Sequence, residues 1–167
     1  MTTATVAQKS SMKSKRPRYE NPATLADERK FQQRFESRFP EYILRKNPIQ
    51  YRMDWCVLEK KTERVIAMIE YRDRKYTRYQ IGQWNGLKIS LMKMHHALEL
   101  YERMGVPVKL FFRFKDSLEG EYWRFEVTRE NVLKCEITWM NMVSRNDPQD
   151  QEPVMLIPLS LLEKKQL

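Results

Sequence analysis

The sequence predicts an α/β (α+β) fold in which helices flank a mixed central sheet, in the order αββαβ with further strands towards the C-terminus. Two segments, 24–38 and 89–105, place apolar residues at helical spacing. Runs rich in aromatic and branched residues, typical of strands, occupy 51–58, 65–69 and 106–114. Because a strand, a crossover helix and a strand follow one another, two of these strands are expected to pair in parallel.

The start of the chain differs in composition from the rest. It is small, polar and basic, with nothing that could pack, and it predicts a disordered basic tail over residues 1–22. Two interpretations of the tail stay open: extra nonspecific affinity for phosphate, or a solvated leader without a role. At 167 residues the chain suits one domain, which we place at 23–167.

The first predicted helix contains an acid on its apolar side. Leu25, Phe31 and Phe35 are spaced as on one helix face, and Pro40 ends the pattern. Glu28 lies three residues before Phe31 and belongs to the same stripe, so it is expected to point inwards and to need a partner. The alternative is that an acid in the first turn only complements the helix macrodipole.

A hairpin is predicted next, with strands at Tyr51–Leu58 and Val65–Ile69 joined by a polar turn at Glu59–Glu63. The second strand is apolar on both faces, as a central strand covered on both sides would be. Asp54 falls in the middle of the first strand, where an unpaired carboxylate would be costly to bury. Such an acid is expected to be a ligand or to form a salt bridge.

The second hairpin strand ends on an acid and a cation. Glu70 and Arg72 are two residues apart, so they share a face of the strand and stand roughly 7 Å apart. Asp54 meets Glu70 at one end of the sheet if the hairpin places both on neighbouring strands. Two carboxylates held close repel one another unless a divalent cation or a proton lies between them. Oxygen ligands suit Mg²⁺, and metal-assisted phosphodiester hydrolysis needs such an arrangement.

Turn and helix-end signals place the remaining elements. Residues 76–88 are expected to form a polar connection with a turn at Asn85 and Gly86, and Gly105 is expected to cap the helix that follows. The later strand-like runs are Tyr122–Val127, Leu133–Val143 and a last run from Val154.

The charge of the chain favours a polyanionic partner. The formal net charge is +9, and neutralising phosphates releases condensed counterions, so nucleic acid is the expected partner. The alternative is that the charge only keeps the protein soluble. No apolar run approaches the roughly 18 residues of a membrane span, and the N-terminus lacks a signal peptide. We therefore expect no membrane partner and a cytoplasmic location.

A basic, tyrosine-rich segment follows the second hairpin strand. Tyr76 and Tyr79 interleave there with the cations Arg74, Lys75 and Arg78. The cations would grip phosphates while the rings stack on unpaired bases or on the sugar face. The alternative is an ordinary charged loop that its aromatic residues anchor.

In this order the motifs resemble those of the PD-(D/E)XK nuclease superfamily, and in particular the small nuclease-like proteins of bacteriophages. The segment DERKFQQRFESRFPEYILRKNP is similar to the opening helix of the family, with Glu28 as its inward acid. YRMDWCV supplies Asp54, and VIAMIEYRDR supplies Glu70, with Arg72 where the family has lysine. ISLMK resembles a helix with a further lysine, here Lys93. GVPVKLFFRFKD and DPQDQEPVMLIPL are similar to the strand after that helix and to the closing segment.

The resemblance implies a restriction-endonuclease-like core and a phage-type nuclease that hydrolyses DNA with Mg²⁺ or Mn²⁺. It implies Asp54 and Glu70 as metal ligands, and Glu28 as a residue that orients the site or binds a second metal. Arg72 and Lys93 would neutralise the phosphate. Because the pKa of arginine lies above about 12, Arg72 stabilises charge but does not act as a base.

The arginine leaves more than one function open. Lys93, or Lys75 just past the strand, could reach the same phosphate, and a metal ion itself lowers the pKa of bound water. The alternative function is a weakened or inactive nuclease-fold protein that acts as a nucleic-acid-binding or host-directed regulatory module. A third is a structural virion component. The resemblance covers roughly residues 24–160. It implies a location in the host cell cytoplasm. Because many related nucleases pair to cut both strands, it also allows a homodimer.

Overall fold

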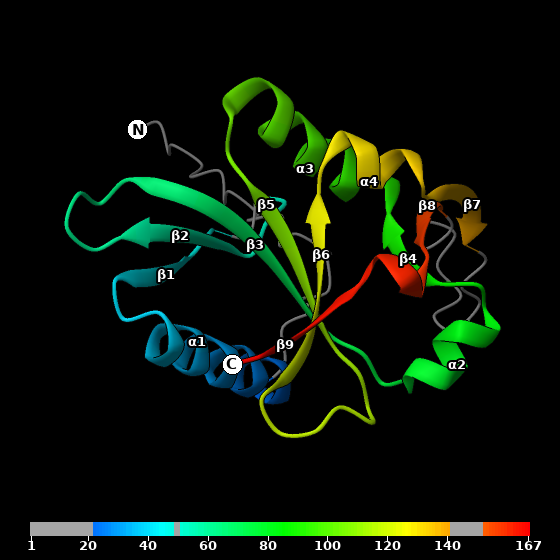
Figure 1. Cartoon of the computed structure of the whole chain (residues 1–167), viewed down its shortest axis with the longest axis horizontal. Coiled ribbons are helices and arrows are strands. Elements are labelled where there is room, and N and C mark those ends of the chain that lie inside the picture. The colour runs from blue at the N-terminus through cyan, green and yellow to red at the C-terminus, as the bar shows by residue number, and fades with distance from the viewer. Residues whose placement is uncertain (1–21, 49–50, 141–151) are drawn as a thin grey trace, which may run out of the picture.

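The computed structural model describes residues 22–48, 51–140 and 152–167, which form two sheets with flanking helices (Figure 1). The larger sheet has six strands in the order β1-β2-β3-β5-β6-β9, and the smaller sheet has three in the order β4-β8-β7. The strands of the larger sheet are β1 (Tyr42–Lys46), β2 (Trp55–Glu59), β3 (Val65–Asp73), β5 (Val108–Arg113), β6 (Glu121–Val127) and β9 (Glu163–Gln166). Those of the smaller sheet are β4 (Leu87–Ser90), β7 (Glu136–Met140) and β8 (Glu152–Ile157). The helices are α1 (Pro22–Arg38), α2 (Arg78–Gln83), α3 (Leu91–Met104), α4 (Arg129–Leu133) and the 3-10 helix η2 (Leu159–Leu161).

The larger sheet is mixed, as the sequence predicted. β3 and β5 pair in parallel, with Met68 opposite Val108 and Asp73 opposite Arg113, while the other neighbouring strands in this sheet pair antiparallel. The parallel pair arises because α3 carries the chain across the sheet between the two strands. This confirms the predicted mixed sheet flanked by helices and its restriction-endonuclease-like core.

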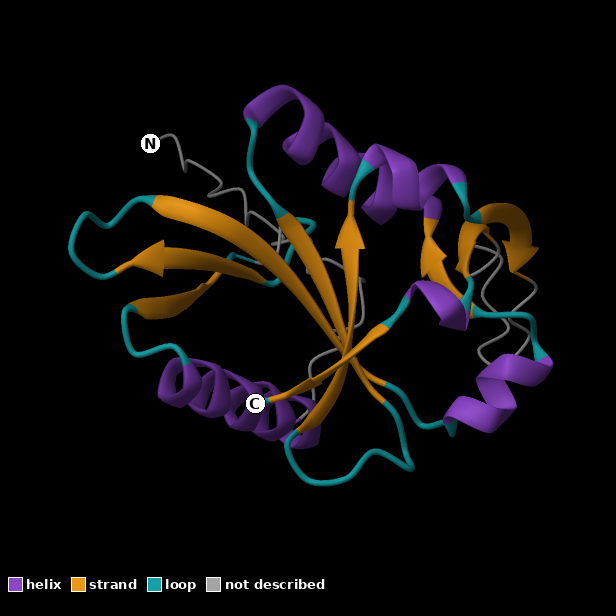
Figure 2. Cartoon of the chain, viewed as in Figure 1, coloured by secondary structure: helices purple, strands orange, loops and turns teal. Residues whose placement is uncertain are grey.

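Two apolar cores lie on opposite faces of the larger sheet. Figure 2 shows α1 on one side of the strands, and α3 and α4 on the other. Phe31 and Phe35 of α1 pack on β3 and its neighbours, whereas Met94 and Ala97 of α3 pack on β5 and β6. Each core excludes water from one face of β3, so β3 is the covered central strand that the sequence predicted.

The alternation of β3 decides which side chains meet on each face. Ile69 and Tyr71 are buried in the core against α1. Glu70 and Arg72 therefore point to the opposite face, where α3 lies. The two side chains that the sequence singled out are thus placed together, beneath the start of α3.

Several element boundaries differ from the predicted ones. The elements β1, α2 and β4 were not predicted, so the order from α1 to β5 is αβββαβαβ. β2 begins at Trp55, not at Tyr51, and Asp54 lies in a bend just before it. β9 was also not predicted, because its charged sequence EKKQ lacks the apolar alternation of a strand. It forms by pairing with β6 at the edge of the sheet.

The connection over 76–88 contains more structure than its polar sequence suggested. α2 forms there because Thr77 and Gln80 make a reciprocal capping box at its first turn. β4 follows at Leu87–Ser90 and pairs with β8. The predicted cap of the next helix is confirmed, since Gly105 has a φ of 63°, which an L side chain rarely adopts.

The predicted tail falls, except for Pro22, outside the described residues, as does the end of the predicted strand at 141–143. Pro22 itself begins α1. The division into a tail and one domain stays a prediction. None of the helices in the described ranges combines the length and the apolarity that crossing a membrane requires.

We expect Phe31→Ala to destabilise the protein by about 3–5 kcal/mol, because Phe31 is 0% exposed and its ring stacks on Tyr71 at 4.6 Å. Leu118→Ala is the matched control, since Leu118 is 71% exposed, and we expect a change within about 0.5 kcal/mol. Urea unfolding followed by circular dichroism measures both. Equal effects of the two substitutions would contradict the packing described here.

Candidate active site

The carboxylate of Glu70 lies buried on the α3 face of β3. Its side chain is 0% exposed. Oε1 of Glu70 forms an ion pair with Nη2 of Arg72 at 2.5 Å and a second one with Nζ of Lys93. Oε2 is buried as well, and no hydrogen-bond partner for it is found within the described parts of the chain. One oxygen of this carboxylate is thus neutralised by two cations, and the other is an uncompensated acceptor.

The start of α3 brings Lys93 to this carboxylate. Ser90 ends β4 and α3 begins at the next residue, so Lys93 stands in the first helical turn. Its neighbour Met94 is buried in the core, which fixes the helix against the sheet. Lys93 therefore reaches Glu70 from an element 23 residues further along the chain, a contact that the sequence analysis did not predict.

Burial raises the pKa of the Glu70 carboxyl. Among nearby charges, Arg72 lowers this pKa, Asp54 raises it and Lys93 lowers it, in that order of size. For the Arg72 guanidinium, burial lowers the pKa, but the carboxylates of Glu70, Asp54 and Glu28 together raise it above its ordinary value. The three acids that the sequence singled out therefore act on one guanidinium.

Asp54 is held beside Glu70 by the backbone of β3. In the ladder between β2 and β3, Trp55 lies opposite Ile69, so one further residue places Asp54 opposite Glu70. Oδ2 of Asp54 accepts a hydrogen bond of 2.9 Å from the backbone N–H of Tyr71. The prediction that Asp54 lies in mid-strand is wrong, because the ladder begins at Trp55. Asp54 and Glu70 thus lie at the same end of the hairpin, and the Asp54 charge raises the pKa of Glu70, which is what the predicted meeting of the two carboxylates requires.

Glu28 points inwards and has a partner that the sequence analysis missed. Its side chain is 11% exposed, and its Oε2 lies 2.6 Å from Nζ of Lys46. Lys46 ends β1 and shares a face with Leu44, which is buried against α1. Alternation along β1 would have identified Lys46, but this strand was not predicted. Glu28 is thus an ion-paired acid at the border of the site.

Two cations of the tyrosine-rich segment fold back onto the protein. Nη2 of Arg74 donates to the backbone carbonyl of Lys88 at 3.0 Å, and burial lowers the pKa of Arg74 to about 10. The guanidinium of Arg78 lies 3.6 Å from the centre of the Trp123 ring, in a cation–π contact. These two side chains anchor the segment, which fits the alternative of a charged loop held in place by aromatic packing.

The other predicted nucleic-acid contacts are exposed. Tyr79 is 75% exposed and Tyr76 is 44% exposed, and Lys75 is exposed beside them. The Tyr76 ring meets the Trp84 ring edge to face at 4.8 Å. Lys75, Tyr76 and Tyr79 are therefore available for phosphates and unpaired bases, and that role stays a prediction.

The donor set of the site suits a hard cation. Within the described ranges, no group of three or more His, Cys, Asp or Glu residues has the placement of a metal centre. Mg²⁺, however, needs one or two carboxylates, because it keeps several waters and takes further oxygens from phosphate. Asp54 and Glu70 meet that requirement, and Oε2 of Glu70 is a buried oxygen for which the described residues supply no hydrogen-bond partner. The residues therefore fit a hard divalent cation.

Comparison with known protein families gives a match over residues 14–165, to the family described as "Phage putative PDDEXK endonuclease". The matched range contains all the site residues described above. Searches of curated proteins and of solved structures give no match.

The pH dependence of stability provides a test of the buried carboxylate. A carboxyl whose pKa is raised by folding binds more protons in the folded than in the unfolded state, so stability falls as pH rises above the unfolded value of about 4.3. In metal-free protein, we expect the stability of wild type relative to Glu70→Gln to fall as pH rises from about 4. The fall is about 1.4 kcal/mol for each unit by which folding raises this pKa.

Urea unfolding of both proteins over a range of pH measures this difference. A difference that is constant with pH, or that grows in favour of the wild type, would show that the Arg72 and Lys93 charges outweigh burial.

Proposed function

The chain belongs to the phage PD-(D/E)XK endonuclease family, and from this premise we propose that it is a divalent-metal-dependent nuclease that hydrolyses phosphodiester bonds in DNA. The observation that supports the chemistry best is the buried Glu70 carboxylate. The charge of Asp54 acts on it, two cations pair with its Oε1, and its Oε2 has no partner among the described residues. A carboxylate held in this way has the form of a cation ligand.

Asp54 and Glu70 are the residues that would hold Mg²⁺ or Mn²⁺. When bound, such an ion lowers the pKa of a coordinated water and polarises a phosphoryl oxygen. The backbone N–H of Tyr71 keeps Asp54 oriented for this role by occupying its Oδ2. Tyr71 thus belongs to the site through its main chain.

Arg72 and Lys93 bring positive charge to the position of the substrate phosphate. In the family, the lysine of the motif stands at the position of Arg72. We assign the role of that lysine to Lys93, whose ammonium pairs with Oε1 of Glu70, as Arg72 does. Arg72 stays charged and stabilises negative charge at the phosphate. Glu28, held by Lys46, orients the guanidinium of Arg72 through its charge.

The alternative is a weakened or inactive nuclease that binds nucleic acid or a host component. One observation favours it: Glu70 is already paired with Arg72 and Lys93, so a cation must compete with both side chains. DNA binding that persists in EDTA, with no cleavage under any metal, would select this alternative. As part of the nuclease proposal, we place the protein in the host cytoplasm and propose a homodimer as its active form.

We expect Asp54→Asn and Glu70→Gln each to reduce DNA cleavage by about a hundredfold or more, because each removes a charged oxygen ligand. Duplex and branched DNA, incubated with Mg²⁺, Mn²⁺ or EDTA, provide the assay. Glu126→Gln is the matched control, since Glu126 lies on β6 with a side chain that is 43% exposed. Full metal-dependent cleavage by Asp54→Asn would refute the assignment.

We expect Arg72→Lys to raise cleavage by roughly tenfold or more, because an ammonium supplies proton transfer that a guanidinium does not. Lys93→Met is expected to lower it by a similar factor. Both variants are measured on the same substrates with Mg²⁺. A loss of activity in Arg72→Lys, together with unchanged activity in Lys93→Met, would contradict the roles assigned to these cations.

A further inference from the structure

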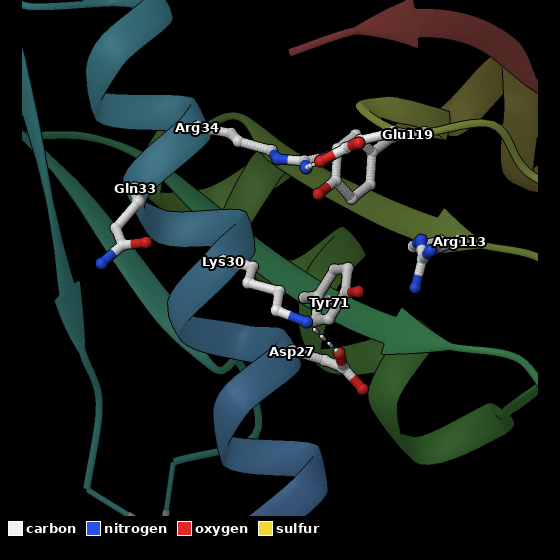
Figure 3. Close-up of a pocket in the computed structure, with 8 residues that line it drawn as sticks. Asp27, Lys30, Gln33, Arg34, Tyr71, Arg113 and Glu119 are labelled. Atoms are coloured by element: carbon white, nitrogen blue, oxygen red, sulfur yellow. Dashed lines mark hydrogen bonds and ion pairs between the residues drawn. The ribbon is translucent and has the colours of Figure 1, made fainter.

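A polar cavity of about 410 Å³ lies on the face of β3 opposite to Glu70 (Figure 3). We call it the reverse cavity. α1 forms one wall, and the carboxyl end of β5 and the loop before β6 form the other. Its size falls within the roughly 300–1,000 Å³ of ligand sites in proteins. Its charged and hydroxyl-bearing lining consists of three cations, two acids and two tyrosines: Lys30, Arg34, Arg113, Asp27, Glu119, Tyr71 and Tyr122.

Among the residues that the structure describes, two of the cations in this cavity have only distant carboxylate partners. Nζ of Lys30 lies 3.9 Å from Asp27, and Nη1 of Arg113 lies 3.8 Å from Asp73. Both separations exceed the roughly 2.7–3.2 Å of a hydrogen bond, so these donors are not committed to the carboxylates. Arg34, by contrast, pairs with Glu119 at 2.5 Å. Lys30 and Arg113 are therefore the cations that an anion would engage.

Two tyrosines form a rigid floor beneath these cations. Tyr71 is 4% exposed and Tyr122 is 2% exposed, and both rings pack on Phe31, at 4.6 Å and 5.3 Å. Burial raises the pKa of both hydroxyls, so each stays protonated and donates at neutral pH. Figure 3 shows the Tyr71 hydroxyl and Arg113 on the same side of α1 as Lys30. The cavity thus combines cationic and neutral donors.

A second cavity lies at the ends of β3 and β5. It has a volume of about 430 Å³, shares Arg113 with the first, and is also lined by Asp73, Arg74, Lys75 and Lys115. Three residues of β3, roughly 10 Å, separate Glu70 from Asp73 at the strand end. A nucleic acid chain that ran from the proposed cleavage site to the reverse cavity behind β3 would pass Lys75, Arg113 and Lys115 at this strand end.

We propose that the reverse cavity binds the terminal phosphomonoester of a nucleic acid chain whose interior lies at the Glu70 site. A phosphomonoester carries a charge of about −1.5 to −2 and three accepting oxygens, which match two loosely paired cations and two hydroxyls. A phosphodiester carries one charge and continues in both directions, whereas α1 and the tyrosine floor bound this cavity. The inference rests on the proposed function and names its substrate class as nucleic acid with a phosphorylated end.

Binding to three single-stranded oligonucleotides of one sequence tests this inference. One carries a 5′-phosphate, one a 3′-phosphate and one no terminal phosphate, and the full-length protein is titrated in EDTA so that no strand is cut. We expect one phosphorylated form to bind about tenfold more tightly than the form without a terminal phosphate. In a competition experiment, dAMP is added to the complex with the phosphorylated oligonucleotide. The concentration of dAMP that displaces the oligonucleotide shows whether the cavity prefers a chain end or a free nucleotide.

Substitutions in the reverse cavity test whether the preference for a phosphorylated end arises there. Arg113→Gln is expected to reduce it to about twofold or less, and Tyr71→Phe, which keeps the ring and the main chain, is expected to reduce it in part. Lys109→Gln is the matched control, because Lys109 lies on the same face of β5 at its other end, and the preference should persist. Equal affinity for the three oligonucleotides, or a preference retained in Arg113→Gln, would overturn the inference. Because binding is measured without cleavage, this outcome is distinct from failure of the nuclease proposal.

Discussion

The ion pairs of the buried Glu70 carboxylate are the interaction on which the site depends. A charged group without exposed surface is costly unless cations or hydrogen bonds compensate it. Arg72 comes from the same strand and Lys93 from α3, so the carboxylate ties the crossover helix to the central strand. Within the described part of the chain only one oxygen is compensated in this way, and the other is left for a further positive charge.

The same strand presents different chemistry on its two faces because its side chains alternate. Glu70 and Arg72 face α3, while Tyr71 between them packs on Phe31 of α1 and lines the reverse cavity. The main chain of Tyr71 holds Asp54, and its side chain forms part of the cavity floor. Tyr71 therefore joins the proposed cleavage site to the proposed phosphate site without any intervening element.

The sequence predicted the central part of the site because it follows from strand alternation and from the order of the elements. Glu70 and Arg72 share a face as expected, Lys93 comes from the predicted helix to the same carboxylate, and Glu28 points inwards. Lys46 was missed because its short strand has no strong apolar pattern. The folding back of Arg74 and Arg78 depends on contacts with β4 and Trp123, which are distant in the chain and leave no local signal. The reverse cavity likewise arises from α1, β3 and β5 together.

Anomalous diffraction from crystals grown with Mn²⁺ tests the central claim most directly. The account requires an anomalous peak between Asp54 and Glu70, with carboxylate oxygens at about 2.0–2.2 Å and at least one of the Arg72 and Lys93 contacts to Glu70 lengthened. A fully occupied crystal form without a peak there, in which both cations still contact Oε1, would contradict it. The protein would then be a member of the nuclease family that binds nucleic acid without cutting it.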